Sequence, residues 1–331
     1  MFYLGIDGGG TKTAFILINE SGDIAAYTTR PTCHYVQVGI NIFQEVLTKG
    51  IIEVCTQASI KKEEIDFSFL GLPGYGENKD DAVKMENIVG DILENNRFRC
   101  GNDVEAGWAG SLACHPGINL VGGTGAIGFA KDGNGNSARA SGWGYFCGDE
   151  GSAYWFGRQL ISLFGKQADG REEKTEIYDI VCKEFNLNRD LDFITVVYDV
   201  LEKKRDKIAS LAVLLYEAVK KGDQRAAELY QKAAYEHSLT VKALVNKLDF
   251  AKDEEIMVSY SGGVFKAGLY ILKPLKTYIE KTMVGRDIKL IEPILQPITG
   301  AALYALLLDK QIDNYEMVVD RLEKEEERLG L

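Results

Sequence analysis

The chain lacks the features that mark nucleic-acid-binding and membrane-spanning proteins. No long run of Lys and Arg offers a track for a phosphate backbone, and Asp and Glu outnumber Lys and Arg by 49 to 38, giving a net charge of −11. No apolar stretch reaches the length that a bilayer requires, and no basic segment precedes the first apolar run. We therefore expect a cytoplasmic protein that binds neither nucleic acid nor membrane.

The chain also has few residues suited to metal or disulfide frameworks. It has six cysteines and three histidines, and no two cysteines form a C-x-x-C pair. Neither a zinc site nor a small disulfide framework is expected, and most cysteines should be buried apolar thiols. What the chain does have is 331 residues, 46% of them hydrophobic, which is ordinary for a globular protein and favours two domains.

The most informative stretch is residues 4–13, where three consecutive glycines (8–10) join two apolar runs. This pattern predicts a strand, a tight turn and a second strand. Without Cβ atoms the turn can direct its N–H groups towards an anion, and Thr11 and Thr13 add hydroxyl donors. Asp7, at the end of the first strand, suits a hydrated Mg²⁺. A glycine-rich hairpin with no ligand remains the alternative.

A second stretch, residues 119–130, partly repeats the first. Gly122-Gly123-Thr124-Gly125 again separates two expected strands, and a further turn follows at the same separation as in the first copy. Chance similarity between two hairpins is one explanation. A duplicated domain that holds nucleotide phosphates between its halves is the other, and it predicts domains at 1–114 and 115–331.

Apolar periodicity along the chain predicts an α/β protein with mixed sheets. Between about 153 and 248 the pattern is almost wholly helical, which we interpret as a helical insertion in the second domain. The expected strands are 2–7, 13–19, 24–29, 67–72, 97–101, 118–122, 126–131, 137–141, 255–260 and 287–291. The other expected helices are 40–57, 79–95, 104–113, one from about 265, one from 298, and 315–331.

Three further segments carry candidate chemistry. Asp103 lies at a strand-to-helix junction, where it could cap the helix or accept a proton from an attacking hydroxyl. Residues 141–155 are dense in glycine, aromatic and acidic residues, a composition that suits a sugar. Within them, Asp149 is either a helix cap or a ligand. The turn at Gly262 and Gly263 would let a flat ring approach the backbone, although such turns are common.

Taken in order along nearly the whole chain, these motifs resemble the N-acetylglucosamine kinase branch of the BadF/BadG/BcrA/BcrD ATPase family. The string at residues 148–155, Gly-Asp-Glu-Gly-Ser-Ala-Tyr-Trp, is specific for that branch. The resemblance implies the actin-like ATPase (ribonuclease H-like) fold, with two duplicated α/β domains around an ATP cleft. It also implies MgATP as cofactor, a homodimer, and transfer of the γ-phosphate to the 6-hydroxyl of N-acetylglucosamine, N-acetylmuramic acid or both.

The resemblance assigns roles to individual residues. Asp103 would be the general base on the sugar's 6-hydroxyl, and Asp7 would hold Mg²⁺ through water. The nucleotide would contact Gly9, Gly10, Thr11, Lys12, Thr13, Gly123, Thr124, Gly125, Gly262 and Gly263. The sugar would contact His34, Gly74, Asp103, Gly142, Trp143 and Asp149.

One position departs from the family, because His34 stands where the resemblance leads us to expect a sugar-binding asparagine. It could pair with the lactyl carboxylate of N-acetylmuramic acid, or it could lie beside the site without a role. Three other functions stay open. They are a kinase for glucosamine or another hexose, an ATP-driven activator of a 2-hydroxyacyl-CoA dehydratase, and a non-enzymatic sugar sensor. The activator needs cysteines for an iron–sulfur cluster, and no suitable pair is present.

Overall fold

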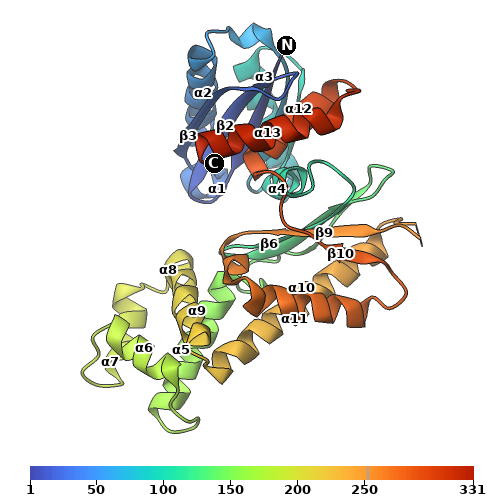
Figure 1. Ribbon diagram of the computed structural model, residues 1–331. Coiled ribbons are helices and arrows are strands. Elements are labelled where there is room, and N and C mark those ends of the chain that lie inside the picture. Colours follow the sequence, from blue (N-terminus) through green and yellow to red (C-terminus); the bar gives the residue numbers. More distant parts are fainter. Residues whose placement is uncertain (252) are drawn as a thin grey trace. The chain divides into compact units, whose positions relative to one another are not determined.

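The computed structural model describes residues 1–251 and 253–331, which form two compact units. The first unit contains Met1–Asn119 and Glu292–Leu331, and the second contains Leu120–Ile291. Each unit is built on its own five-stranded sheet, and Figure 1 labels the elements of both. The predicted α/β class is therefore confirmed. The expected division at residue 114 does not hold for the last segment, because Glu292–Leu331 packs with the N-terminal sheet.

The first sheet has the order β3-β2-β1-β4-β5. β1 (Phe2–Gly8) pairs antiparallel with β2 (Lys12–Asn19), which pairs antiparallel with β3 (Ile24–Pro31). On its other side β1 runs parallel to β4 (Ile65–Leu72), and β4 runs parallel to β5 (Phe98–Asn102). The carboxyl ends of β1, β4 and β5 therefore share one edge with the β1–β2 turn.

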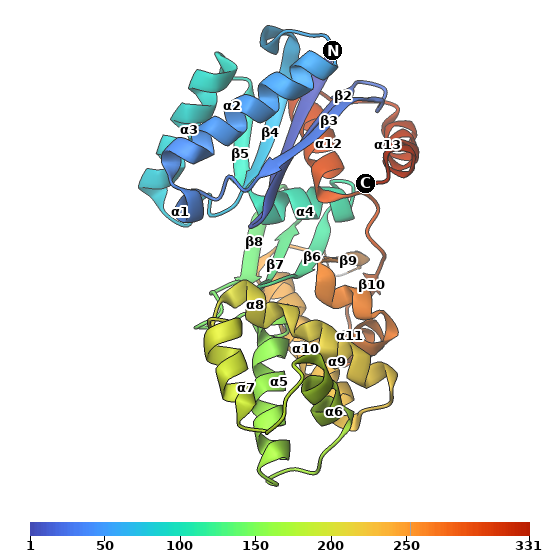
Figure 2. The ribbon, with the colours of Figure 1, turned by 90° about the vertical axis from the view of Figure 1, so that its left-hand side faces the viewer.

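Helices cover both faces of this sheet, because alternate residues of its central strand are apolar on each side. Leu4, Ile6 and Phe15 join a buried cluster with α2 (Ile40–Gln57) and α3 (Lys79–Leu93). On the opposite face, α4 (Asp103–Ser111) and α12 (Pro297–Asp309) pack together and α12 lies on β1, as Figure 2 shows. An ideal Cβ at Gly5 would lie 2.5 Å from the amide nitrogen of Ala302, so this glycine lets α12 approach closely. That close packing explains why the C-terminal segment belongs to the first unit.

The remaining elements of the first unit complete these layers. The other helical elements of this unit are α1 (Tyr35–Val38), η1 (Lys62–Glu64) and α13 (Tyr315–Leu329). α13 was expected as a charged amphipathic helix, and it buries only one stripe, which includes Val318 and Leu322. An ideal Cβ at Gly22 would lie 2.8 Å from the carbonyl oxygen of Val318, so α13 packs against the β2–β3 turn.

The second sheet has the order β10-β9-β6-β7-β8, which read from β8 repeats the strand order of the first sheet. Its strands are β6 (Gly117–Gly122), β7 (Ala126–Lys131), β8 (Ser137–Ser141), β9 (Ile256–Ser261) and β10 (Ile288–Leu290). β7 and β8 pair antiparallel, and β9 and β10 pair parallel, as the corresponding strands of the first sheet do. The matching order supports the duplication that the repeated glycine turns predicted.

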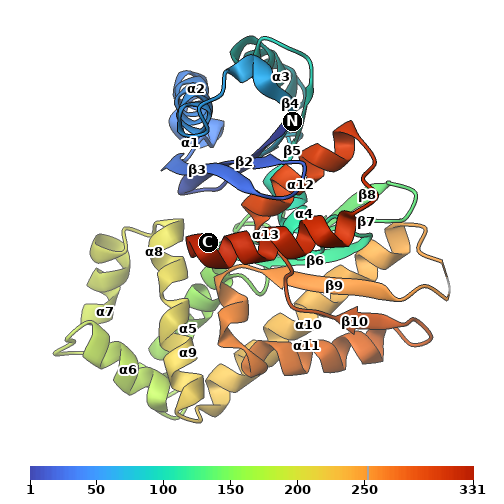
Figure 3. The same cartoon turned by 45° about the horizontal axis from the view of Figure 1, so that its top comes forward.

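Two long helices pack beside each other against the second sheet, α10 (Gln224–Lys247) and α11 (Leu269–Thr282), as Figures 1 and 3 show. The expected helical insertion is confirmed as α5 (Ala153–Ala168), α6 (Glu176–Glu184), α7 (Asp192–Thr195), η2 (Val196–Val200), α8 (Arg205–Ser210), α9 (Ala212–Lys220) and α10. The helix expected from about 265 begins as a separate short turn, η3 (Gly263–Ala267). The other expected strands and helices are found with their ends in place or shifted by at most two residues. Within the described part of the chain, every helix is too short or too polar to cross a membrane.

Candidate active site

One edge of the first sheet gathers the candidate residues of the N-terminal half. An ideal Cβ at Gly8 would lie 2.6 Å from Cδ of Pro73 and 3.0 Å from Sγ of Cys33, so the ends of β1, β3 and β4 meet there. An ideal Cβ at Gly74 would lie 3.6 Å from the ring of His34, which brings two predicted sugar contacts together. In α/β sheets ligands bind at the carboxyl ends of the strands. This edge is therefore the candidate site of the first unit.

Asp103 lies at this edge, but it is not the helix cap. Asn102 caps α4, because its side-chain oxygen accepts a hydrogen bond from Val104 N at 3.3 Å and its amide donates to the carbonyl of Tyr75 at 3.0 Å. Asp103 is the first helical residue and is half-buried, with Oδ1 3.1 Å from Val104 N. The neighbouring asparagine holds the cap position, so the presence of an aspartate here has another cause.

Asp7 ends β1 beside the same edge and is half-buried. Burial and the negative charge of Asp103, opposed by the positive charge of Lys12, together raise the pKa of its carboxyl group to about 7. Two carboxylates are thus close enough to repel each other. Among residues 1–251 and 253–331 no three His, Cys, Asp or Glu side chains gather as a metal site. A hydrated Mg²⁺ that also binds phosphate oxygens fits this pair of carboxylates.

The first glycine turn differs in detail from the predicted set of phosphate donors. Thr13 is fully buried, and its hydroxyl donates to the carbonyl of Pro31 at 3.2 Å while accepting from Cys33 N at 2.9 Å. Its side chain therefore fastens β2 to the end of β3. Gly9 is partly exposed and residues 10–12 are exposed at the tip, where their donors can reach a ligand.

The second glycine turn is held in shape by backbone hydrogen bonds. Gly123 N donates to the carbonyl of Gly125 at 3.0 Å, and Ala153 N, at the start of α5, donates to the carbonyl of Gly123 at 2.9 Å. Thr124 is exposed at the tip. The turn thus presents a threonine beside the amino end of a helix, an arrangement that suits an anion.

Gly262 and Gly263 adjoin this turn but have different surroundings. Gly262 has φ +97°, and an ideal Cβ there would lie 2.5 Å from the carbonyl oxygen of Gly122. Nothing lies within 4 Å of an ideal Cβ at Gly263. That open space belongs to a largely apolar cavity of about 380 Å³, which could take a flat ring. Its lining residues are Ala153, Phe156, Ala209, Ala212, Val213, Tyr216, Tyr230, Gly263, Val264, Lys266 and Ala267.

Asp149 is a buried residue of the second unit. Only 3% of its side chain is exposed, and it forms an ion pair of 2.8 Å with Arg205. Burial raises the pKa of its carboxyl group, while Arg205 and the backbone N–H groups of Ala126 and Gly144 oppose that rise. Ser152 is the cap of α5, since its hydroxyl accepts from Trp155 N at 3.1 Å. Asp149 is therefore not the cap.

Sequence reasoning missed Arg205, which is one of several cations in the segment Lys203-Lys204-Arg205-Asp206-Lys207. Only its contact with Asp149, distant in the sequence, distinguishes it from its neighbours. Of the predicted aromatic residues, Tyr154 is buried, Trp155 is half-buried and Trp143 is exposed. Gly142, next to Trp143, has φ +71°, and its ideal Cβ would lie 2.5 Å from the side chain of Ile127. The exposed Trp143 ring is available to cover a ligand's apolar face.

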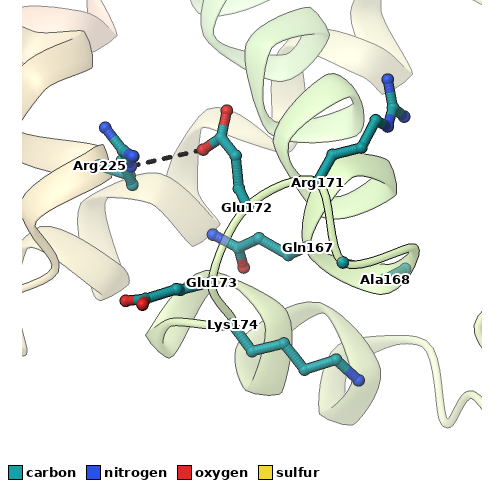
Figure 4. Close-up of a pocket in the computed structure, with 8 residues that line it drawn as sticks. Gln167, Ala168, Arg171, Glu172, Glu173, Lys174 and Arg225 are labelled. Atoms are coloured by element: carbon teal, nitrogen blue, oxygen red, sulfur yellow. Dashed lines mark ion pairs between the residues drawn. The ribbon is translucent and has the colours of Figure 1, made fainter.

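A larger hollow of about 580 Å³ lies within the helical insertion, and Figure 4 shows the side chains that line it. It is polar, and its walls include an ion pair of 3.4 Å between Arg225 and Glu172. None of the residues predicted for the site lines it. We interpret it as a surface depression lined mainly by charged side chains.

The chain is similar to a known protein family and to two sugar kinases. The chain matches the BadF/BadG/BcrA/BcrD ATPase family over residues 4–305. It is 27% identical over 315 residues to the N-acetyl-D-glucosamine kinase of Dictyostelium discoideum, covering 92% of this chain and 97% of that protein. It is also 27% identical over 278 residues to the N-acetylmuramic acid/N-acetylglucosamine kinase of Clostridium acetobutylicum, covering 84% of this chain and 90% of the relative.

Solved structures give the same result for the fold. A candidate N-acetylglucosamine kinase from Chromobacterium violaceum superposes with a TM-score of 0.68 at 24% identity, covering 93% of this chain and 99% of that one. A ROK hexokinase from Thermus thermophilus superposes with a TM-score of 0.61 at 21% identity, covering 94% and 100%. With two sheets of matching strand order, these likenesses confirm the duplicated actin-like ATPase fold.

Proposed function

Because the chain belongs to the BadF/BadG/BcrA/BcrD ATPase family, we propose that it is an ATP-dependent amino-sugar kinase. It would transfer the γ-phosphate of ATP to the 6-hydroxyl of N-acetylglucosamine, N-acetylmuramic acid or both. The substrate class is supported by the names of two relatives, both of which align with most of this chain. The observation that carries the proposal is the position of Asp103 at the ligand-binding edge of the first sheet, where Asn102 already caps the helix.

Each unit by itself offers groups that suit a nucleotide. In the second unit the adenine ring would enter the apolar cavity beside Gly263, and Thr124 would contact phosphate oxygens at the neighbouring turn. In the first unit the exposed tip at residues 10–12 would supply further donors, and Asp7 would hold Mg²⁺ through water. Bound Mg²⁺ neutralises phosphate charge during transfer. The buried Thr13 would act by fixing the turn.

The sugar would lie against Asp103, so that its 6-hydroxyl donates a proton to this carboxylate as the oxygen attacks. Phosphoryl transfer depends mainly on positioning and charge stabilisation, with a smaller contribution from a base. His34 and Gly74, which lie together, would contact the sugar in the first unit. Gly142, Trp143 and Asp149 stay the predicted sugar contacts of the second unit.

The test is a coupled assay of ADP release with MgATP and a panel of N-acetylglucosamine, N-acetylmuramic acid, glucosamine and glucose. We expect the highest kcat/KM with one or both N-acetylated sugars, and ³¹P NMR of the product should locate the phosphate on O6. ATP hydrolysis without a sugar phosphate would contradict the proposal. Preference for glucosamine would favour the alternative that a 23% identical glucosamine kinase of Vibrio cholerae suggests.

Two further properties belong to this proposal. Relatives of the kinase branch lead us to propose a homodimer, which light scattering of the purified protein would measure. A monomer at assay concentration would contradict it. A cytoplasmic location, where ATP and salvaged sugars are available, is the other property, and cell fractionation would test it.

A further inference from the structure

The guanidinium group of Arg205 lies over the second glycine turn. An ideal Cβ at Gly125 would lie 2.4 Å from a terminal nitrogen of Arg205 and 2.8 Å from Oδ2 of Asp149. Any side chain at position 125 would therefore push the guanidinium away from the turn. The glycine at this position leaves room for a positive charge beside a turn whose backbone already suits an anion.

Two neighbouring side chains hold Arg205 in this place. Asp149 accepts its hydrogen bond at 2.8 Å, and the guanidinium carbon lies 5.5 Å from the centre of the Tyr145 ring. Asp149 is itself fixed by backbone N–H groups of Ala126 and Gly144. The arginine side chain nevertheless stays 41% exposed, whereas the aspartate is 3% exposed. The guanidinium is thus anchored to Asp149 by one nitrogen, while the arginine side chain as a whole is not buried.

We propose that Arg205 is a phosphate-binding residue, which donates hydrogen bonds to the terminal phosphates of ATP, and that Asp149 positions it. This inference rests on the proposed function. A guanidinium has five N–H donors in a planar arrangement, so it can bind Asp149 and phosphate oxygens at once. Hydrogen bonds between charged partners are short and roughly twice as strong as neutral ones.

The transfer step explains why a cation belongs here. The bond between the γ-phosphorus and the oxygen that bridges it to the β-phosphate breaks, and that oxygen leaves with its electron pair on ADP. A new bond forms from the sugar O6 to the γ-phosphorus, and the hydroxyl proton passes to Asp103. Negative charge therefore grows on ADP during the step, and Arg205 stabilises it.

Calorimetric titration of the full chain with ATP, ADP and adenosine, in the presence of Mg²⁺, tests this assignment. Arg205→Ala should weaken ATP and ADP binding by about 10- to 100-fold, the range for a lost charged hydrogen bond, and leave adenosine binding within about twofold. Lys207→Ala is the matched control, because Lys207 lies in the same helix and pairs with Glu202 away from the turn. The control should bind all three ligands as the wild type does.

Removal of Arg205 leaves the buried Asp149 without its cation, which can destabilise the fold. Arg205→Lys keeps the charge but loses the planar fork, so we expect it to fold and to recover only part of the ATP affinity. Added guanidinium should raise the turnover of Arg205→Ala, which a purely structural role would not produce. If the alanine variant does not fold, Arg205→Lys and Gly125→Ala decide the matter by the same titrations.

The outcomes separate the two proposals. Wild-type protein that binds none of the nucleotides would contradict the proposed function and, with it, the role of Arg205. Wild-type protein that binds ATP while Arg205→Ala and Arg205→Lys bind it equally well would contradict the role of Arg205 alone. A loss of adenosine affinity as large as the loss of ATP affinity would show that Arg205 only maintains the fold.

Discussion

The two glycine turns occupy equivalent places in the two sheets, yet the charged side chains around them differ. Asp7 and Asp103 lie at the turn between β1 and β2, and they repel each other. At the turn between β6 and β7, Arg205 lies against Gly125 and is anchored by Asp149. Backbone donors are common to both copies, whereas side chains from other elements differ. Under the proposals above, the duplicated backbone would supply anion binding, and each unit would add its own charged groups, for proton and metal chemistry in the first and for phosphate in the second.

The largest expected effect concerns the acidic turn. Asp103→Asn should keep wild-type stability and sugar binding but lower kcat by about 10²- to 10⁴-fold, because the general base is lost. Asn102→Ala is its matched partner and should lower the free energy of unfolding by about 1 kcal/mol through loss of the cap. Initial rates and urea unfolding of both variants measure the contrast. A wild-type kcat in Asp103→Asn would show that Asp103 is not the group that accepts the proton.

Acid should affect the two units in opposite directions. Burial lowers the pKa of the His237 imidazole, and although the hydrogen bond to the carbonyl of Gly151 partly opposes the decrease, the pKa is about 4. Because the unfolded chain protonates His237 first, stability should fall by about 3 kcal/mol as pH drops from 6.5 to 4. The raised pKa of Asp7 acts oppositely, since its folded state takes up a proton near pH 7 and so gains stability as pH falls towards 4.

Urea unfolding at a series of pH values between 7.5 and 4 measures both contributions. His237→Gln should flatten the loss of stability below pH 6.5, because the glutamine amide can still donate to Gly151 without titrating. Asp7→Asn should steepen that loss, because its compensating protonation is gone. An unchanged pH dependence in His237→Gln would show that this histidine is not buried in its neutral form.

Glycine substitutions should separate the roles of the two turns. Gly125→Ala should lower kcat/KM for ATP by about 10- to 100-fold by displacing Arg205, and it should also lower stability because the buried Asp149 loses its cation. Gly8→Ala should lower stability by about 1–3 kcal/mol, because its Cβ would meet Pro73 Cδ at 2.6 Å. Gly133→Ala, with nothing within 4 Å of its Cβ, is the control for both. Equal effects of Gly8→Ala and Gly125→Ala on stability and on kcat/KM for ATP would contradict the different roles given to the two turns.

The smallest expected effect concerns sugar choice in the first unit. His34→Asn should shift the ratio of kcat/KM for N-acetylmuramic acid to that for N-acetylglucosamine by several-fold towards the latter, because a cation-forming ring that can pair with the lactyl carboxylate is lost. Assays with both sugars at saturating MgATP measure this ratio. An unchanged ratio would mean that His34 does not contribute to the choice between the two sugars.

Sequence pattern predicted the strands, most helices and the duplication, but not α1 or the division of the insertion into separate helices. Alternating apolar residues specified β1 and β2, helical periodicity specified α10, and glycine at Gly8 and Gly123 marked the turns. The same patterns could not assign α12 to its unit, because its short, apolar run would suit either sheet. Only the close approach of Ala302 to Gly5 decided that.

The site divides in the same way. By itself the sequence determined the two glycine turns and the carboxylates Asp7 and Asp103, because local chemistry at strand ends is encoded by neighbouring residues. Tertiary structure alone decided that Asn102 caps α4, that the Thr13 hydroxyl is engaged within the protein, and that Arg205 reaches Gly125. These assignments depend on which groups are left with hydrogen-bond partners after folding. Most of these contacts join residues that are far apart in the chain, so local sequence patterns cannot predict them.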